Sequence, residues 1–381
     1  MKIGIITILK VNNYGAELQA YATQAFLRKL GYEAEIIDYL FYKNPGHKKT
    51  TMSRPLFKFD LRKKVSEFLY PIFDKIKNLR NWEISKSRII RFEEFHKAHT
   101  HLSKTYRTAD DLYNSQMDYD VYLTGSDQVW NPGIYSSIAP YFLDFVPKDK
   151  RRISYAASFG VSNIPDDCIE TYKSFLSKYS AIGVRERDAV DLVKSISGKT
   201  ATWVLDPTFL LSKNEWLDIG QMIQAPKENF LLIYELTPCP YIIKLSRHIA
   251  RTLGIKIVRI CKDSAIIEND NSVINICDAG PSEFLYLFDK ASFVVTNSFH
   301  GTAFAVNFNK PFYTVLPFHK QNNSRQRSLL KLLDLEDRCL IEGSEFPIAS
   351  SFDIDYESVN HKLNEEREKS INFLIESING K

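Results

Sequence analysis

A histidine between two apolar runs is the residue whose type and position most clearly suggest chemistry. His300 follows the apolar, β-branched run 292–296 and precedes Gly301 and Thr302, which we expect to open a short helix. Ligands of open α/β sheets bind where a strand ends and a helix begins, and unpaired helix N–H groups favour an anion there. We therefore predict that His300 transfers a proton beside a phosphate or carboxylate. The alternative is a buried histidine satisfied by the backbone. The polar neighbours of this histidine are candidate substrate contacts: Asn297, Ser298, Gly301 and Thr302.

Two closely spaced arginines could supply the positive charge that an anion needs. Arg185 and Arg187 follow the apolar run 181–184, at a predicted strand end and helix start. A guanidinium at such a position suits bidentate binding of a carboxylate or phosphate. The alternative is an ion pair with an acidic neighbour in the same turn. Asp206, after the next apolar run, could brace one of the two arginines.

The loop after the first predicted strand is a second candidate ligand loop. Asn13 and Tyr14 offer side-chain hydrogen bonds, and Gly15 gives the backbone freedom. The loop does not contain the GxGxxG pattern of dinucleotide-binding proteins, so a dinucleotide cofactor has little support.

A third polar loop follows the apolar run 121–124. Gly125 permits close approach of the backbone to a ligand, and Ser126 and Asp127 could hydrogen-bond to sugar hydroxyls. Asp127 is also a candidate for orienting or deprotonating a hydroxyl, and Trp130 offers a flat apolar face. The alternative for Asp127 is a cap of a helix or turn.

Alternating strand and helix patterns position these loops. The 381-residue chain is too long for one ordinary core and suits two α/β domains. We expect the first over residues 1–212 and the second over 213–350. A final helix, predicted over 356–378 within the segment 351–381, could pack back across the first domain.

A helical insertion over about 43–104 interrupts the first domain. Its apolar residues recur at helical spacing over 61–79, with basic residues among them. We favour an inserted helical hairpin with a solvated face. The alternative is a basic surface that makes peripheral contact with the inner face of a membrane or with a lipid-linked substrate. The spacing of His96, His99 and His101 matches no defined metal site, so we expect a solvated helix end there.

Composition excludes several classes of protein. The formal net charge of +4 gives no general case for nucleic acid as a partner. The five cysteines contain no CxxC pair, which indicates neither a zinc site nor a disulfide framework and fits a reducing compartment. No apolar segment is long enough to span a bilayer, and the start of the chain reads as a strand rather than a signal peptide. We therefore expect a cytoplasmic protein without a metal or cofactor.

The chain resembles the polysaccharide pyruvyl transferase family. The motifs that carry the resemblance run in order from residue 12 to residue 312: NNYGAELQA, YLTGSDQVWNP, ISYAASFG, IGVRERDAV, WVLDPTFLL and TNSFHGTAFAVNFNKPF. GSDQVW and SFHGTAFA together are specific. The resemblance implies two Rossmann-like domains facing each other across a cleft, in a GT-B-like α/β fold. It also implies transfer of the pyruvyl group from phosphoenolpyruvate to two hydroxyls of a sugar, as a ketal, with release of phosphate.

The resemblance also assigns roles to individual residues. The histidine of the family matches His300, and its arginine at the start of a helix matches Arg185. A further basic residue, usually lysine, corresponds by spacing to Arg325, with Arg327 nearby. The family often has arginine or leucine just before the histidine, where this chain has Phe299. That difference bears on the choice of acceptor.

Two other functions fit the same architecture. One is a glycosyltransferase that uses a nucleotide sugar, which would release a nucleotide instead of inorganic phosphate. The other is a non-catalytic glycan-binding protein, which would respond to glycan and not to phosphoenolpyruvate. The sequence indicates neither the acceptor sugar nor the oligomeric state.

Overall fold

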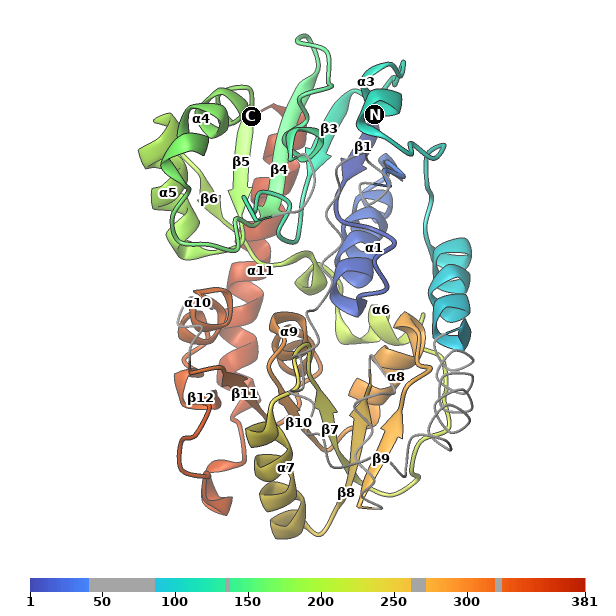
Figure 1. Cartoon of the computed structure of the whole chain (residues 1–381), viewed down its shortest axis with the longest axis vertical. Helices are drawn as coiled ribbons and strands as arrows, with labels where there is room; N and C mark the ends of the chain where they lie inside the picture. Colours follow the sequence, from blue (N-terminus) through green and yellow to red (C-terminus); the bar gives the residue numbers. More distant parts are fainter. Residues whose placement is uncertain (41–85, 134–137, 262–271, 319–323, 381) are drawn as a thin grey trace, which may run out of the picture.

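The chain folds into two α/β domains, each built on a six-stranded parallel sheet (Figure 1). The computed structural model describes residues 1–40, 86–133, 138–261, 272–318 and 324–380. The sheet of the first domain has the order β2-β1-β3-β4-β5-β6. Its strands are β1 (Lys2–Ile6), β2 (Glu33–Ile36), β3 (Val121–Thr124), β4 (Arg151–Ala157), β5 (Ala181–Val184) and β6 (Thr202–Trp203).

The second domain repeats this plan. Its sheet has the order β12-β11-β10-β7-β8-β9. The strands are β7 (Phe230–Tyr234), β8 (Lys256–Ile260), β9 (Val273–Ile276), β10 (Phe293–Thr296), β11 (Phe312–Leu316) and β12 (Cys339–Ile341). Because β3, β7, β10 and β11 are buried along their whole length, they read in the sequence as continuous apolar runs, as strands of covered parallel sheets do.

Helices connect and cover the strands of both sheets. In the first domain these are α1 (Tyr14–Lys29), a helix over 86–99, α3 (Ala109–Tyr113), α4 (Ile169–Ser177) and α5 (Arg187–Ser197). The short helix α6 (Lys213–Leu217) follows in the connection to the second domain. The second domain carries α7 (Pro240–Leu253), α8 (Pro281–Lys290), α9 (Phe299–Asn307) and α10 (Ser324–Leu332). The chain therefore has the predicted α/β class, with two Rossmann-like, GT-B-like domains.

The strand orders fix where loops can form a site. In the first sheet the order reverses between β1 and β3, and in the second it reverses between β7 and β10. The loops after β1, β3 and β10 leave the carboxyl ends of these strands, which is where open α/β sheets bind ligands. Asn13 and Ser126 lie in the first two of these loops, and His300 follows the third, in the first turn of α9.

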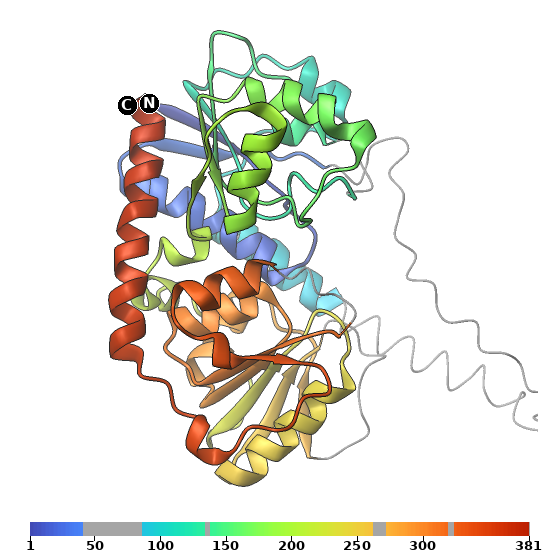
Figure 2. The same cartoon turned by 90° about the vertical axis from the view of Figure 1, so that its left-hand side faces the viewer.

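The last helix joins the two domains. Helix α11 (Tyr356–Asn379) is the single long helix predicted at this end of the chain, and it runs alongside both domains (Figure 2). Ser370 accepts a hydrogen bond from the Leu205 amide at 2.9 Å, and Arg151 Nη1 donates to the carbonyl of Ile378 at 3.1 Å. Both partners belong to the first domain, so α11 ties the end of the chain to the sheet that begins it.

Several local expectations were wrong. Helix α9 begins at Phe299 and not at Gly301, because Ser298 caps it and the Gly301 amide donates to the Ser298 hydroxyl at 3.3 Å. Trp130 offers no surface to a ligand, since it is fully buried and stacked on Phe142. His96 is not on a solvated helix end but is buried beside Glu17, with 3.1 Å between its Nε2 and a carboxylate oxygen.

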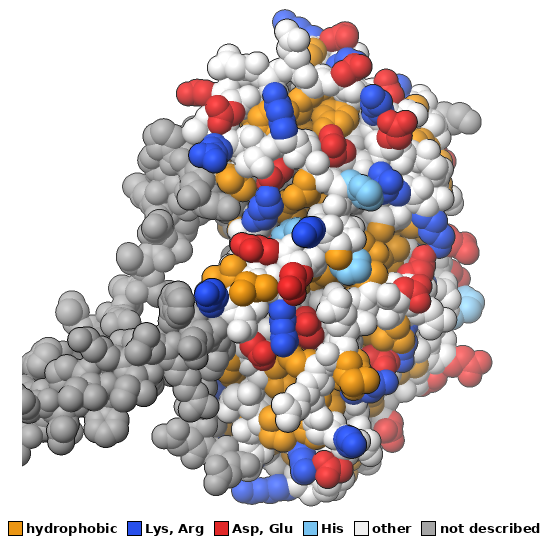
Figure 3. Space-filling model, turned by 90° about the vertical axis from the view of Figure 1, so that its right-hand side faces the viewer, with side chains coloured by type: hydrophobic (Ala, Val, Ile, Leu, Met, Phe, Trp, Pro, Cys, Tyr) orange, Lys and Arg blue, Asp and Glu red, His pale blue; other side chains and the backbone are white. Residues whose placement is uncertain are grey.

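The surface of the described chain mixes both signs of charge. Basic and acidic side chains are interspersed on the face drawn in Figure 3. No helix in the described ranges has the length and apolar character needed to cross a bilayer. The stretch over 61–80, for which we favoured a helical hairpin over a membrane-contacting surface, lies outside the described residues.

Candidate active site

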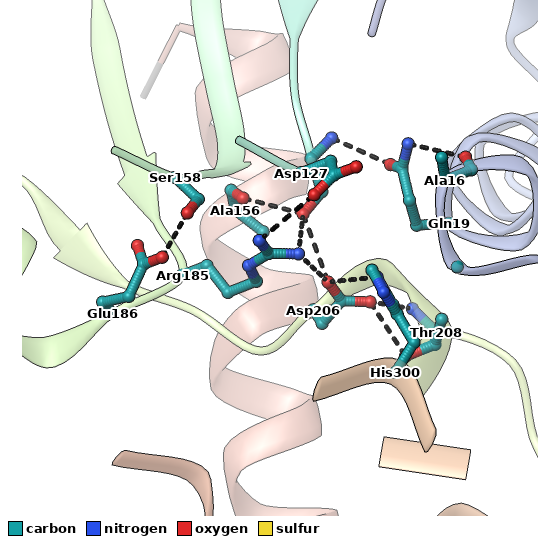
Figure 4. A network of polar contacts seen from close by, with 12 residues as sticks. Ala16, Gln19, Asp127, Ala156, Ser158, Arg185, Glu186, Asp206, Thr208 and His300 are labelled. Carbon is teal, nitrogen blue, oxygen red and sulfur yellow. Dashed lines mark hydrogen bonds and ion pairs between the residues drawn. The ribbon is translucent and has the colours of Figure 1, made fainter. Parts of the chain in front are cut away.

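A buried carboxylate at the seam between the domains connects an arginine and a histidine. Asp206 Oδ2 accepts a hydrogen bond from Arg185 Nη1 at 2.9 Å, and His300 Nε2 lies 3.6 Å from the same oxygen (Figure 4). The other oxygen, Oδ1, accepts from the amide and hydroxyl of Thr208 at 3.0 and 2.8 Å. The prediction that Asp206 braces one of the arginines is therefore confirmed for Arg185.

The electrostatics keep this carboxylate ionised. Burial of Asp206 opposes ionisation, but His300, Arg185 and the Thr208 amide outweigh it and hold the pKa of Asp206 well below its ordinary value. Burial also works against the charge on Arg185, yet Asp206 and Asp127 raise the pKa of that guanidinium overall. A fixed negative charge thus faces the imidazole, and it would stabilise the imidazole when protonated.

His300 reaches from the second domain onto the first. It lies in the first turn of α9, and only 7% of the residue is exposed. Its Nδ1 lies so close to Gly15 that a Cβ built on that glycine would be 2.0 Å away. Its Nε2 forms no hydrogen bond within the described part of the chain, because 3.6 Å to Asp206 is too long for one. The imidazole is therefore held by packing on α1 and lies beside Asp206.

A second arginine stands beside the first. The guanidinium carbons of Arg185 and Arg325 lie 4.7 and 5.9 Å from the ring centroid of Phe299. With the Gln128 amide oriented to present its oxygen, that oxygen accepts from both Nη atoms of Arg325 at 3.0 and 3.1 Å. Burial and then the charge of Arg185 lower the pKa of Arg325. Since the two cations repel each other, an anion bound between them would relieve the repulsion.

The loop after β3 supports this cluster from the first domain. Gly125 is required there, because its φ is 118° and a Cβ would lie 2.2 Å from the Tyr155 carbonyl oxygen. Ser126 is fully buried, and its hydroxyl lies 2.8 Å from the Ala156 carbonyl oxygen and 3.2 Å from Asp206. Ser126 therefore contacts the interior and not an open surface. Asp127 keeps part of its side chain exposed, with 3.5 Å from its Oδ1 to Arg185 Nη2.

A further carboxylate lies behind the arginines. Glu186 is buried, accepts a hydrogen bond from the Ser158 hydroxyl, and leaves its Oε2 without a hydrogen bond in the described residues. Burial raises the pKa of Glu186, and Arg185 and Arg325 only partly offset this. The sequence allowed an ion pair between Arg185 and an acidic neighbour such as Glu186. In the structure, Arg185 pairs with Asp206 instead.

The loop after β1 shapes the seam between the domains. Asn13 caps α1, because its Oδ1 accepts from the amides of Gly15 and Ala16 at 3.0 and 3.4 Å. Tyr14 crosses to the second domain, where its hydroxyl donates to the Ala279 carbonyl at 2.7 Å. Asn13 and Tyr14 thus position Gly15 beneath His300.

The remaining predicted residues near His300 bond to the protein itself. Asn297 accepts from the Leu236 amide at 2.8 Å and donates to the Thr237 carbonyl at 2.7 Å. Thr302 is fully buried and donates to the Ser298 carbonyl at 3.0 Å. These side chains hold the loop and helix that carry the histidine.

Arg187 and Arg327 lie elsewhere. Both are exposed, and both line a separate cavity that contains neither Arg185 nor His300. The structure therefore brings Arg325 to the histidine cluster and keeps Arg327 away from it. Among the described residues, no group of three or more His, Cys, Asp or Glu side chains is arranged to hold a metal ion.

Sequence reasoning missed three residues of the cluster: Phe299, Gln128 and Glu186. Phe299 was noted only as a difference from related sequences, and its ring proves to underlie both guanidinium groups. Gln128 lies within the GSDQVW motif but had no assigned role. The sequence could have pointed to these three residues, because each lies within three positions of a predicted site residue.

Comparison with known proteins identifies the family of the chain. The profile of the polysaccharide pyruvyl transferase family matches residues 13–317, and no curated protein matches the chain. Similar solved structures include UDP-N-acetylglucosamine 2-epimerase from Neisseria meningitidis bound to UDP-N-acetylglucosamine, at 10% identity, TM-score 0.45 and coverage of 99% of this chain and 94% of that one. A glycosyltransferase from Rickettsia africae has 12% identity, TM-score 0.44 and coverage of 97% and 93%. Because the family profile covers most of the length, from the α1 cap to the end of β11, the chain belongs to the polysaccharide pyruvyl transferase family.

Proposed function

We propose that the protein transfers the pyruvyl group of phosphoenolpyruvate to two hydroxyls of a sugar in a cell-surface glycan or its precursor. The product is a cyclic ketal, and inorganic phosphate is released. The observation that carries the proposal is the pair of arginines over Phe299, next to a histidine that faces an ionised carboxylate. Phosphoenolpyruvate carries a phosphate and a carboxylate, so it needs converging positive charge.

The residues have separate roles in this proposal. Arg185 and Arg325 bind the two anionic groups of the donor. His300, doubly protonated, directs its Nε2 proton at Asp206 and keeps its Nδ1 proton for the donor. Asp127 orients the attacking sugar hydroxyl or takes its proton. Asp206 is a positioning residue, because it acts through His300 and Arg185.

The chemistry balances without another reactant. Protonation of the donor methylene uses the electrons of the double bond and leaves a cation-like carbon, which one sugar oxygen attacks as it loses its proton. The bond between this carbon and the phosphate oxygen then breaks, and its electron pair leaves with the phosphate. The second hydroxyl attacks the same carbon and closes the ring, and its proton passes to the departing phosphate. Since the overall transfer involves no net oxidation or reduction, the proposal includes no redox cofactor. We infer a cytoplasmic reaction, and a lipid-linked acceptor would bring the protein to the inner face of a membrane.

Thermal-shift titration tests the choice of donor before an acceptor is known. A ligand at one hundred times its dissociation constant should stabilise the protein by about 2.7 kcal/mol. We expect phosphoenolpyruvate to do so, whether or not UDP-N-acetylglucosamine also binds. Arg325→Gln should weaken the phosphoenolpyruvate response, and Arg251→Gln, which removes an exposed arginine of α7, should leave it unchanged. A response to the nucleotide sugar alone would reject the proposal in favour of a glycosyltransferase.

A further inference from the structure

A second cationic cavity lies where α5 of the first domain meets α10 of the second. Its volume is about 470 Å³, within the range of small-molecule sites. Three basic side chains line it, together with one carboxylate, one tryptophan, one leucine and three serines: Arg187, Arg327, Lys331, Asp188, Trp203, Leu332, Ser162, Ser324 and Ser328. None of the residues that form the His300 cluster contributes to its lining.

Each arginine at the Phe299 ring has a second arginine two residues further along the chain, which lies in the second cavity. Arg185 and Arg187 are two residues apart, as are Arg325 and Arg327. The first arginine of each pair lies at the Phe299 ring, and the second lines the cavity. Consecutive Cα atoms are 3.8 Å apart, so two residues span at most about 7 Å. The cavity is therefore a near neighbour of the proposed donor site.

The basic side chains of the cavity have no hydrogen-bond or ion-pair partner among the described residues. In the described ranges no hydrogen bond or ion pair engages the side chains of Arg187, Arg327 or Lys331, and Asp188 is the single carboxylate in the lining. Other lysines of the chain, such as Lys178 and Lys256, are paired with acidic residues. Three cations and one carboxylate leave a net charge of +2 in the cavity, which favours an anionic ligand.

Helix α10 presents a polar face to this space. Ser324, Arg327, Ser328 and Lys331 follow the i, i+3, i+4, i+7 spacing of one helix face, and all four line the cavity. Their donors suit phosphate oxygens. On the other wall, Trp203 donates its Nε1 proton to the Arg185 carbonyl at 3.0 Å, which fixes the indole beside the cavity. An aromatic face of this kind suits the apolar face of a sugar ring.

We propose that this cavity binds a phosphate or diphosphate group attached to the acceptor sugar. The inference rests on the proposed function, because it takes phosphoenolpyruvate to occupy the arginines at Phe299. An acceptor anchored by its phosphate in the cavity would hold its sugar against Trp203 and toward His300. The substrate class is then a sugar phosphate or sugar diphosphate rather than a neutral finished polysaccharide.

Calorimetric titration with inorganic pyrophosphate tests the site directly. Wild-type protein should bind pyrophosphate in the presence of saturating phosphoenolpyruvate. Arg327→Gln and Lys331→Gln should each weaken this binding about tenfold, since each removes one charge-assisted contact. Lys244→Gln, which removes an exposed lysine of α7, is the matched control and should bind normally. Unchanged affinity in both cavity variants would overturn the proposal.

Competition separates this site from the donor site. Arg325→Gln should weaken phosphoenolpyruvate binding and leave pyrophosphate binding intact. Arg327→Gln should weaken pyrophosphate binding and leave phosphoenolpyruvate binding intact. If phosphoenolpyruvate displaces pyrophosphate, the two anions share one site and the inference is wrong. If phosphoenolpyruvate fails to bind but pyrophosphate binding still depends on Arg327 and Lys331, the anion site stands and the donor proposal fails.

Two carriers of the phosphate group can be told apart in the same assay. A nucleotide-linked sugar is represented by UDP-N-acetylglucosamine, and a lipid-linked group by geranyl diphosphate. Binding of either one that is weakened by Lys331→Gln supports the site, and the tighter of the two identifies the carrier. Binding of both with no effect of Lys331→Gln would contradict it.

Discussion

His300 and Asp206 form a unit whose parts come from opposite domains. The imidazole meets an ionised carboxylate at 3.6 Å, and that carboxylate is held by Arg185 and by Thr208. A fixed negative charge beside the imidazole suits the role of general acid that we propose for His300. Two arginines nearby offer the charge that an anionic donor needs.

Replacement of His300 tests its role as an acid. His300→Gln should lower the rate of phosphate release from phosphoenolpyruvate by about a hundredfold to ten-thousandfold, the usual cost of removing a positioned acid. The donor should still bind, because the arginines remain. Calorimetry with phosphoenolpyruvate provides the control. Undiminished turnover in this variant would remove His300 from the mechanism.

Asp206 should also determine how stability depends on pH. Its pKa in the folded protein lies below the ordinary value of 3.8, so its ionised form stabilises the fold. This contribution is complete above about pH 4 and is lost as pH falls further. Asp206→Asn should cost about 3–5 kcal/mol at neutral pH, because buried Arg185 loses its counter-ion. Chemical unfolding at several pH values measures this.

Unfolding at several pH values also checks whether the effect of Asp206→Asn comes from the lost charge. The difference in unfolding free energy between wild type and Asp206→Asn should shrink below pH 4, where the wild-type carboxylate begins to lose its advantage. If Asp206→Asn does not fold, the acid-induced loss of stability in wild type remains measurable. A difference between the two proteins that grows toward low pH would contradict the assignment.

The identity of the site residues was partly legible in the sequence. His300, Arg185 and Asp127 stood at predicted strand ends, and the structure brings them to one cluster. The sequence could not show that Ser126 is buried, because its environment depends on strands far along the chain. It also could not choose between Arg325 and Arg327, since residues two apart on a helix face different directions.

At the scale of elements, the amino end of α1 and the amino end of α9 meet across the domain seam. Ser298 caps α9 and Asn13 caps α1, and these caps bring His300 onto Gly15. His300 can approach α1 this closely because Gly15 has no side chain. The first turn of α1 therefore serves as the floor beneath the histidine.

Gly15→Ala tests this contact. The new Cβ would lie 2.0 Å from His300 Nδ1, so the imidazole must move and turnover should fall at least tenfold. Alanine favours a helix over glycine by up to about 1 kcal/mol, so helix stability does not explain a loss. Steady-state kinetics and thermal unfolding together measure both effects. Gly220→Ala, whose nearest neighbouring atom would be at 3.4 Å, should leave turnover unchanged; equal activity in the two variants would count against the contact.

The elements themselves were largely predictable. The final helix was expected over 356–378 and spans Tyr356–Asn379, because its apolar residues follow a helical period. Strand β10 was expected over 292–296 and spans Phe293–Thr296. Element starts were harder to predict, as at α9, because a serine cap three residues earlier competes with glycine as a helix start.

For the whole molecule, side chains of α9 and α11 hold the two domains together by hydrogen bonds to the segment 206–211, which connects them. Asn307 of α9 donates to the carbonyls of Thr208 and Leu211 at 2.9 and 3.1 Å. Arg367 of α11 donates to the Phe209 carbonyl at 2.6 Å. The segment that carries Asp206 is thus fixed to both domains, which sets the position of the carboxylate relative to His300.

Asn307→Ala should loosen this connection. The buried Leu211 carbonyl would lose its donor, and the Thr208 carbonyl would keep only Trp216 Nε1, at a cost of about 1–3 kcal/mol. Because the segment also positions Asp206, turnover should fall together with the thermal midpoint. Lys362→Ala, on the outer part of α11, removes an exposed ion pair with Asp334 and should change neither by much. A large loss in the control and none in Asn307→Ala would contradict this account of the seam.

The sequence indicated two domains and a final helix, but not how they meet. Long-range pairs such as Tyr14 with Ala279 connect segments with no local signal in common. The spatial proximity of α5 and α10, which creates the second cavity, has the same origin. Such contacts follow from the way two sheets are set against each other and cannot be inferred from periodicity.

The most direct test is a crystal structure of the protein with phosphoenolpyruvate bound. The account predicts that the phosphate and carboxylate lie within hydrogen-bonding distance of Arg185 and Arg325, with the methylene carbon facing His300. Donor density at a different place, or no density at concentrations far above the measured dissociation constant, would contradict it.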